Sequence, residues 1–274
     1  MNPLNAIIWD VDPVAFTIPG FDWPVRWYGL LFVFGLLVSQ YIMFHVFERE
    51  GKTRKNVEDL TLYVVIGTII GARLGHVIFY DLGYYLDNPG EILKIWRGGL
   101  ASHGGAIGIL IAIYLYCRKF NFRFLWVFDR LVIVVAFTGA CIRIGNLMNS
   151  EILGTVTSLP WGFQFVRAYP PELALDPRHP AQLYEAIYAF LIGVALYFMW
   201  KNKRDRLKEG FLFGFFMAVL FTLRFLDEFI KIDQEAFEAD LPLNMGQILS
   251  IPFVIAGVYL MVRPAKPIPV QKKG

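Results

Sequence analysis

The chain has 274 residues, of which 56% are hydrophobic and only 18% are charged. A soluble domain carries about a quarter charged residues, so this composition excludes a protein whose whole surface faces water. The net charge of +3 argues against a nucleic-acid-binding protein, which shows a basic patch or stripe.

The cysteines and the N-terminal segment exclude further classes. Cys117 and Cys141 both fall in apolar stretches, without a CxxC pair or a nearby pair of histidines. We expect small buried side chains there, not a disulfide framework or a zinc site, and we expect no metal and no cofactor. The first 24 residues are polar, acidic and interrupted by prolines, unlike a cleavable signal peptide. Membrane insertion is therefore expected to use the internal helices.

Long apolar stretches dominate the rest of the chain. A bilayer core needs about 20 mostly apolar residues per helix, and lipid offers no partner for free backbone groups. We therefore expect an all-α polytopic membrane protein with about seven transmembrane helices, in which residues 1–274 form a single integral membrane domain. In chain order the stretches are Trp27–Phe47, Leu60–Tyr80, Leu100–Cys117, Leu125–Met148, Leu183–Trp200, Phe211–Ile230 and Met245–Val262. Gly67, Gly71 and Gly75 in the second stretch predict close helix packing.

Lysine and arginine are distributed unequally between the connecting segments. Alternate connections and the C-terminal tail together hold sixteen of them, whereas the opposite set holds six. The positive-inside rule then places the N-terminus outside and the C-terminus in the cytoplasm. The longest connection, residues 149–180, becomes extracytoplasmic, and we expect it to form a small head subdomain.

Ionisable side chains inside a bilayer are costly, so each one needs a partner or a function. With this topology the polar set lies near the outer face, and only Asp129 and Arg130 lie at the cytoplasmic end. A channel or transporter needs polar groups along its path or near the midplane, whereas a one-sided site suits an enzyme that takes lipid from the outer leaflet. The outer set is Arg73, His76, His103, Arg143, Asn146, Glu151, His179, Gln182, Glu185, Arg224, Asp227, Glu228 and Gln247.

Three arginines of this set suggest a phosphate ligand. Arginine keeps its charge when desolvated, and its fork matches phosphate oxygens. Arg143 has no acid within one helical turn, so a phosphate head group would be the missing anion. Structural readings stay open, because Arg224 has Asp227 and Glu228 on its own helical face and Arg73 can bond to carbonyl groups.

The two histidines near helix starts are also ambiguous. His103 precedes Gly104 and Gly105, which would admit a ligand, and structural and functional readings are equally open. His179 precedes Pro180 and fits a residue that caps or orients the next helix.

Residues 139–154, with the sequence GACIRIGNLMNSEILG, resemble the signature of the phosphatidylglycerol–prolipoprotein diacylglyceryl transferases. Further matching motifs follow in the same order, and the resemblance covers nearly the whole chain. They are RWYG at 26–29, SHGG at 102–105, HPAQLYE at 179–185, Arg224 with Glu228, and MGQILS at 245–250.

The resemblance implies an enzyme of the bacterial inner membrane. Such an enzyme transfers the diacylglyceryl group of phosphatidylglycerol to the lipobox cysteine thiol of a secreted prolipoprotein, so that a thioether forms and glycerol phosphate leaves. At Leu220 the family can have a tyrosine, and Tyr28 is a candidate for that role. The resemblance marks as functional Tyr28, His103, Arg143, Asn146, Glu151, Gly154 and Arg224.

This chemistry assigns expected roles. A free thiol has a pKa of about 8.5, so it needs a base, and His103 is the first candidate. Arg143 and Arg224 would neutralise the phosphate and stabilise the leaving group, with Tyr28 also catalytic. Lipid binding is expected from Arg143, Asn146, Glu151, Gly154, Arg224 and Glu228, and supporting roles from Arg73, Gly104, His179, Gln182, Glu185 and Gln247.

Two other functions remain open. A lipid flippase would use the same arginines without releasing glycerol phosphate, and a seven-helix receptor would need no lipid chemistry at all.

Overall fold

The computed structural model describes residues 6–232 and 242–264. Four residues counted above lie outside these ranges: Pro3, one of the prolines among the first 24 residues, and Lys266, Lys272 and Lys273 of the C-terminal tail. The chain divides into two compact units, Met1–Ile42 with Phe128–Val270, and Met43–Val127 with Gln271–Gly274. A single integral membrane domain over 1–274 stays a prediction.

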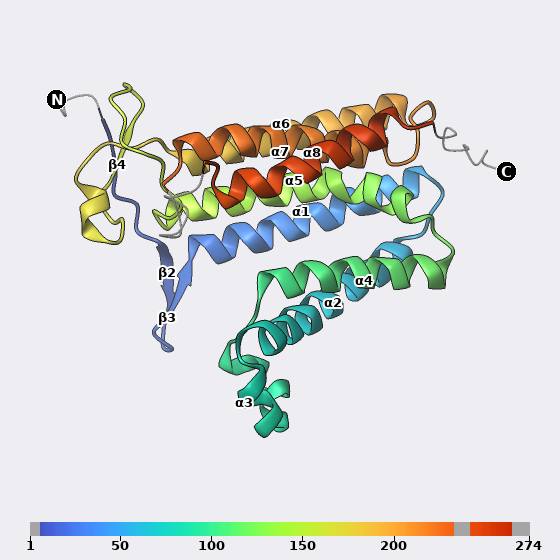
Figure 1. The fold of residues 1–274 in the computed structure, drawn as a ribbon, viewed down its shortest axis with the longest axis horizontal. Helices are drawn as coiled ribbons and strands as arrows, with labels where there is room; N and C mark the ends of the chain where they lie inside the picture. Colours follow the sequence, from blue (N-terminus) through green and yellow to red (C-terminus); the bar gives the residue numbers. More distant parts are fainter. Residues whose placement is uncertain (1–5, 233–241, 265–274) are drawn as a thin grey trace. The chain divides into compact units, whose positions relative to one another are not determined.

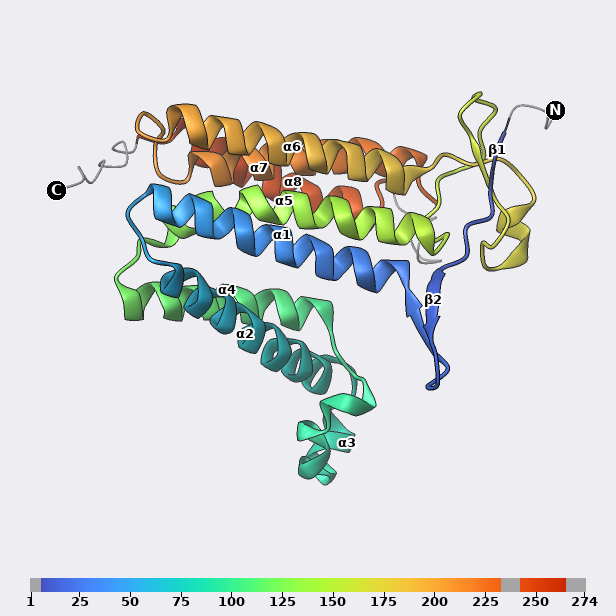
Figure 2. The same cartoon turned by 180° about the vertical axis from the view of Figure 1, so that it is seen from behind.

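Five helices that lie wholly or mostly in the first unit run side by side (Figures 1 and 2). They are α1 (Trp27–Arg49), α5 (Phe124–Met148), α6 (Ala181–Lys203), α7 (Phe211–Asp227) and α8 (Met245–Val262). The C-terminal ends of α5 and α7 lie at the same end of this group as the N-terminal ends of α6 and α8. The β-strands also lie at this end of the five helices, and we call it the strand end. Small residues allow the close approach of α7 and α8, since a Cβ on Gly257 would lie 2.6 Å from the backbone nitrogen of Ala218.

Two long helices form the second unit, α2 (Arg54–Tyr80) and α4 (Ser102–Phe120). The small-residue face of α2 packs on α4, since a Cβ on Gly75 would lie 2.6 Å from Cα of Gly104. The close packing predicted from Gly67, Gly71 and Gly75 is thus confirmed. The short α3 (Leu82–Asp87) and the 3-10 turns η2 (Pro89–Leu93) and η3 (Ile95–Arg97) connect the two helices.

The strands form two small ribbons in the first unit. β1 (Ile7–Trp9) pairs in parallel with β4 (Phe163–Phe165), and β2 (Val14–Ile18) pairs antiparallel with β3 (Trp23–Arg26). Residues 149–180 also include the 3-10 turn η4 (Pro171–Ala174). An apolar cluster supports this connection, as expected for a small head, although a separate subdomain stays a prediction. The cluster consists of Leu147, Leu153, Phe163, Phe165 and Ala168, with Trp9, Leu173 and Ile232 packed against it.

The helices agree closely with the predicted apolar stretches. Within the described residues, α1, α2, α5, α6 and α8 are long and apolar enough to cross a membrane. α4 and α7 coincide with the other two predicted stretches, but α7 has only 17 residues and α4 carries polar residues at both ends. The all-α polytopic fold is confirmed, and the count of seven spans stays a prediction.

Candidate active site

The strand end of the first unit gathers the polar residues of four helices. Arg143 and Asn146 come from the last turns of α5, and Gln182 and Glu185 from the first turns of α6. Arg224 and Asp227 close α7, and Gln247 lies in the first turn of α8. Antiparallel helix order thus brings together residues that lie up to about a hundred positions apart in the chain.

Glu185 is the buried centre of this cluster. Its side chain is only 2% exposed, and its two carboxylate oxygens form ion pairs with Nε of Arg143 and Nζ of Lys231. Nζ of Lys231 lies 3.2 Å from both Asp227 and Glu228. Each buried carboxylate therefore has a cation beside it, as a low-dielectric site requires.

A chain of hydrogen bonds runs outward from Arg143. Nη1 of Arg143 donates to Oδ1 of Asn146 at 3.3 Å, and Nδ2 of Asn146 donates to Oε2 of Glu151 at 3.1 Å. The other Glu151 oxygen accepts from Asn149 at 2.9 Å, and the Glu151 carbonyl accepts from Gln182. Asn146 and Glu151 are thereby fixed relative to the guanidinium.

Arg224 is paired with an acid of its own helical face. Its Nε lies 3.6 Å from Oε1 of Glu228, four residues on along the same face. Glu228 also accepts a hydrogen bond from Asn244 at 3.2 Å, and Gly246 makes room for it, since a Cβ there would lie 2.6 Å from the carboxyl carbon. Gln247 completes a capping box with Asn244 and so fixes the start of α8.

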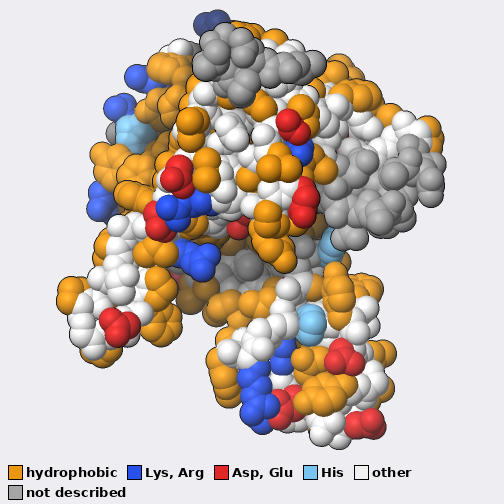
Figure 3. Space-filling model, turned by 90° about the vertical axis from the view of Figure 1, so that its left-hand side faces the viewer, with side chains coloured by type: hydrophobic (Ala, Val, Ile, Leu, Met, Phe, Trp, Pro, Cys, Tyr) orange, Lys and Arg blue, Asp and Glu red, His pale blue; other side chains and the backbone are white. Residues whose placement is uncertain are grey.

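The acids of the cluster are buried, whereas the arginines reach outward. The side chains of Glu185 and Glu228 are 2% and 8% exposed, but those of Arg143 and Arg224 are 25% and 42% exposed. Figure 3 shows this end of the molecule, where acidic and basic side chains stand close together among hydrophobic ones. Arginine has five N–H donors, so both forks keep donors for an anionic ligand.

Two sequence-based interpretations need correction. The inference that Arg143 lacks an acid partner is wrong, because the buried Glu185 of the next helix is paired with it. Lys231 is one of the six basic residues assigned above to the external connections, yet its side chain is 3% exposed and touches three acids. Its spacing of four and three residues from Asp227 and Glu228 was the signal that could have revealed it.

Two of the three glycines of the signature, Gly145 and Gly154, allow close contacts within the first unit, and one of these contacts is with Tyr28. A Cβ on Gly145 would lie 2.8 Å from the Tyr28 ring, so this glycine lets the tyrosine approach α5 beside Asn146. Gly154 lets three chain segments meet, since a Cβ there would lie 2.6 Å from the carbonyl oxygen of His179 and 2.8 Å from that of Ile230. The structure thus gives Gly154 a packing function, and its role in lipid binding stays a prediction.

His179 contacts a tyrosine instead of the arginines. Its Nδ1 lies 3.3 Å from the hydroxyl of Tyr184, which also accepts a hydrogen bond from Trp161 at 3.0 Å. Burial lowers the pKa of His179 below its ordinary value. This geometry agrees with the expectation that His179 orients the start of α6.

Arg73, His103 and Gly104 belong to the second unit. Arg73 is buried and donates to the carbonyl groups of Glu91, Ile92, Gly98 and Gly99, so its guanidinium shapes the 88–99 connection. This bears out the structural interpretation of Arg73. Its donors are used by carbonyl groups, so we do not count it among the arginines that would bind phosphate. His103 is exposed in the first turn of α4, and its role as a base beside Arg143 stays a prediction.

Comparison with known proteins identifies the family. A family model described as "Prolipoprotein diacylglyceryl transferase" matches residues 13–263. The chain belongs to the prolipoprotein diacylglyceryl transferase family. The predictions of family and of a transferase enzyme are thereby confirmed.

Curated relatives match over nearly their whole length. A "Phosphatidylglycerol--prolipoprotein diacylglyceryl transferase" of Porphyromonas gingivalis is 47% identical, with 95% of each chain covered. Proteins of the same name from Tolumonas auensis and Chloroherpeton thalassium are 44% and 43% identical. They cover 95% and 99% of this chain, and 98% and 99% of their own lengths. Together with the apolar helices, the family makes this chain a multi-pass membrane protein.

Proposed function

We propose that this protein transfers the diacylglyceryl group of phosphatidylglycerol to the lipobox cysteine thiol of prolipoproteins, the first step of lipoprotein maturation. The observation that carries the proposal is the pair of outward-reaching arginine forks, Arg143 and Arg224, held from behind by buried acids. Guanidinium groups bind phosphate oxygens through two parallel N–H bonds, and they do so most strongly where water is excluded.

In the proposed reaction the cysteine thiolate attacks the glycerol carbon that bears the phosphate ester. A carbon–sulfur bond forms, the carbon–oxygen bond breaks, and glycerol phosphate leaves with the electron pair. Arg143 and Arg224 neutralise the phosphate that would repel the thiolate, and they stabilise the charge on the leaving group. The proton of the thiol goes to His103, since an imidazole is the side chain that most often serves as a general base.

Neighbouring residues orient the head group. Asn146 lies one turn from Arg143 and is hydrogen-bonded to both Arg143 and Glu151, so its amide is held in one orientation. Tyr28 approaches α5 at Gly145, next to Asn146, and supplies a hydroxyl at the same level of the helix. Glu228 supports Arg224 by its ion pair, and the acyl chains stay among the spans.

The proposal includes the location of the site. The protein would lie in the bacterial cytoplasmic membrane with its N-terminus outside, its C-terminus inside and the strand end facing outward. The excess of lysine and arginine in alternate connections supports this orientation. Labelling of single cysteines placed at exposed positions near each end, such as Leu175 and Lys203, tests it in intact cells.

The reaction is tested with full-length protein in nanodiscs that contain head-group-labelled phosphatidylglycerol, to which a cysteine peptide is added. The thioether product and free glycerol phosphate should appear together. His103→Ala should insert normally and slow the transfer by about 10²–10⁴-fold, as expected for loss of a general base. Lipid movement between leaflets without glycerol phosphate release would show a flippase instead, and a wild-type rate in His103→Ala would remove His103 from the mechanism.

A further inference from the structure

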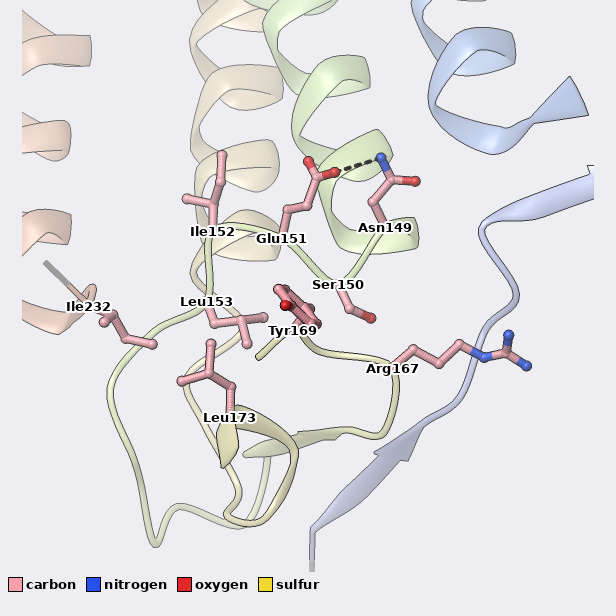
Figure 4. A pocket seen from close by; sticks show the side chains of 9 residues that line it. All are labelled: Asn149, Ser150, Glu151, Ile152, Leu153, Arg167, Tyr169, Leu173 and Ile232. Atoms are coloured by element: carbon pink, nitrogen blue, oxygen red, sulfur yellow. Dashed lines mark hydrogen bonds between the residues drawn. The ribbon is translucent and has the colours of Figure 1, made fainter. Parts of the chain in front are cut away.

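A pocket of about 450 Å³ is lined mostly by the 149–180 connection (Figure 4). It adjoins the polar cluster around Arg143 and Glu185, because Asn146 of that cluster donates a hydrogen bond to Glu151 of the lining. It shares Glu151 with that cluster, but otherwise it is built from residues beyond the end of α5. Its lining consists of Asn149, Ser150, Glu151, Ile152, Leu153, Arg167, Tyr169, Leu173 and Ile232.

One wall of the pocket carries polar atoms whose hydrogen-bonding capacity is not used. Ser150 is only 6% exposed, and its hydroxyl has no hydrogen-bond partner within residues 6–232 and 242–264. The buried Oδ1 of Asn149 likewise has no hydrogen-bond partner within the described residues, whereas the amide nitrogen of Asn149 donates to Glu151. Buried polar atoms are normally paired, so these two indicate a ligand that brings hydrogen-bond donors.

The backbone of this wall is held in an unusual conformation. Ser150 and Ile152 have φ values of 54° and 56°, in the left-handed region that a β-branched isoleucine seldom occupies. Backbone hydrogen bonds from Ser150 to Leu147 and from Glu151 to Asn146 fix the turn. Such strain persists only where the surrounding structure enforces it. The turn brings both Ser150 and Glu151 into the lining of the same pocket.

The opposite wall is apolar, and the charges of the pocket disfavour an anion. Leu153, Leu173 and Ile232 belong to the apolar cluster of the connection and line the pocket. Arg167 is the cation of the lining, and it is paired with Asp10 at 2.7 Å and Asp12 at 3.2 Å. The carboxylate of Glu151 adds negative charge. A neutral group with N–H donors and an apolar side chain fits this wall better than a phosphate does.

We propose that this pocket binds the precursor peptide, taking up one apolar side chain next to the reacting cysteine. The peptide N–H groups donate to Oδ1 of Asn149 and to the hydroxyl of Ser150, while the side chain packs on Leu153 and Leu173. Glu151 connects the pocket to Arg143 through Asn146, so a peptide bound here brings its thiol toward the lipid phosphate. This inference rests on the proposed function, because it supplies the site for its second substrate.

Peptide binding is measured by fluorescence anisotropy with full-length protein in nanodiscs. The probe is a labelled signal-type peptide whose cysteine is replaced by serine, so that no transfer occurs. Leu173→Trp fills the pocket and should raise the Kd of the peptide about tenfold or more, as expected for an occluded apolar subsite. Leu175→Trp is the matched control, because Leu175 lies on the same segment, is 71% exposed and does not line the pocket. The control should change the Kd by less than about twofold.

Ser150→Gly tests the polar wall without adding bulk. Glycine accepts the positive φ and removes the hydroxyl, so the peptide Kd should rise about fivefold for one lost hydrogen bond. The KM for phosphatidylglycerol should stay as in the wild type in both pocket variants. An unchanged peptide Kd in both variants, or a rise in the lipid KM alone, would overturn the proposal.

The unreactive probe separates this proposal from the proposed function. Pocket-dependent peptide binding by a wild-type protein that shows no transfer would support the pocket and contradict the enzyme. If the wild-type protein catalyses transfer while the pocket variants bind peptide normally, the enzyme is supported and the pocket proposal is contradicted.

Discussion

The two ends of the five-helix group use buried charge in different ways. At the end opposite the strands, Asp129 is 1% exposed, and its oxygens accept the backbone N–H groups of Gly210 at 2.7 Å and Phe213 at 2.9 Å. These are free N–H groups at the start of α7, where a negative charge is also favourable. The carboxylate is fully used in fastening α7 to α5.

At the strand end the buried acids support other side chains. Glu185 and Glu228 pair with Arg143 and Arg224, and both arginine forks keep exposed donors. Burial of a charge therefore does not by itself mark a functional site. The distinguishing feature is a charged group that is held in place and still has hydrogen-bonding capacity toward the outside.

Among the buried and half-buried charges at the two ends of the five-helix group, Arg143 is expected to have the largest effect. Arg143→Ala should insert but lose about 10²–10³-fold in transfer rate, the usual loss for one donor to a developing negative charge. Arg143→Lys keeps a charge beside Glu185 and so keeps the fold, but it lacks the two-pronged fork. Initial transfer rates should therefore be low in both variants. A wild-type rate in Arg143→Lys would mean that a point charge suffices and that the fork geometry is irrelevant.

Lys231 should matter first for stability. Lys231→Met leaves Glu185, Asp227 and Glu228 without their shared cation, and removal of one partner from a buried ion pair costs about 3–5 kcal/mol. Thermal unfolding in detergent should show a large drop in Tm. Lys231→Arg is the matched control that keeps the charge and should recover most of the loss. A methionine variant as stable as wild type would show that the acids are not charged in the folded protein.

Asp129 provides the opposite pattern. Asp129→Asn keeps the shape of the side chain but replaces one of its two acceptor oxygens by an NH₂ group. One buried backbone N–H then has no acceptor, which should destabilise the protein by about 1–3 kcal/mol. Transfer per folded molecule should be unchanged, because Asp129 lies at the other end of the helices. If this variant lost its rate at wild-type stability, the two ends could not be separated as described.

The smallest effect concerns pH. Burial lowers the pKa of His179, so the folded protein prefers the neutral ring. The stability from this group is fully present above the ordinary pKa of about 6.5 and is lost as the pH falls through the lower folded value. His179→Gln should therefore show a weaker decrease of Tm between pH 7.5 and 5 than wild type. Equal decreases of Tm in the two proteins would mean that the pKa of His179 does not differ between the folded and the unfolded protein.

The sequence predicted the helices well because apolar length is a local property. Each predicted stretch overlaps one observed helix, and the glycines of α2 lie where close packing was expected. The partners of buried charges were harder, because they depend on which helix ends meet. Arg143 pairs with Glu185, which lies 42 residues away across the head, and no local spacing reveals that pair.

Two residues show what a local pattern does not decide. For Arg73 the sequence left both phosphate binding and bonding to carbonyl groups open, and the irregular 88–99 connection folds back and offers it four carbonyl oxygens. Lys231 follows the 3-10 turn η5 (Glu228–Ile230), which comes after α7, and the sequence analysis counts it with the external connections. Its burial arises from α6 packing against it, which hydropathy and periodicity do not describe.

The central claim is that Arg143 and Arg224 together bind the lipid phosphate, and lipid selectivity tests it most directly. Binding of phosphatidylglycerol and of diacylglycerol with the same acyl chains is compared by native mass spectrometry for wild type and for Arg143→Gln with Arg224→Gln. The wild type should prefer the phosphate-bearing lipid strongly, and the double variant should bind both lipids equally. An undiminished preference in the double variant would contradict the account.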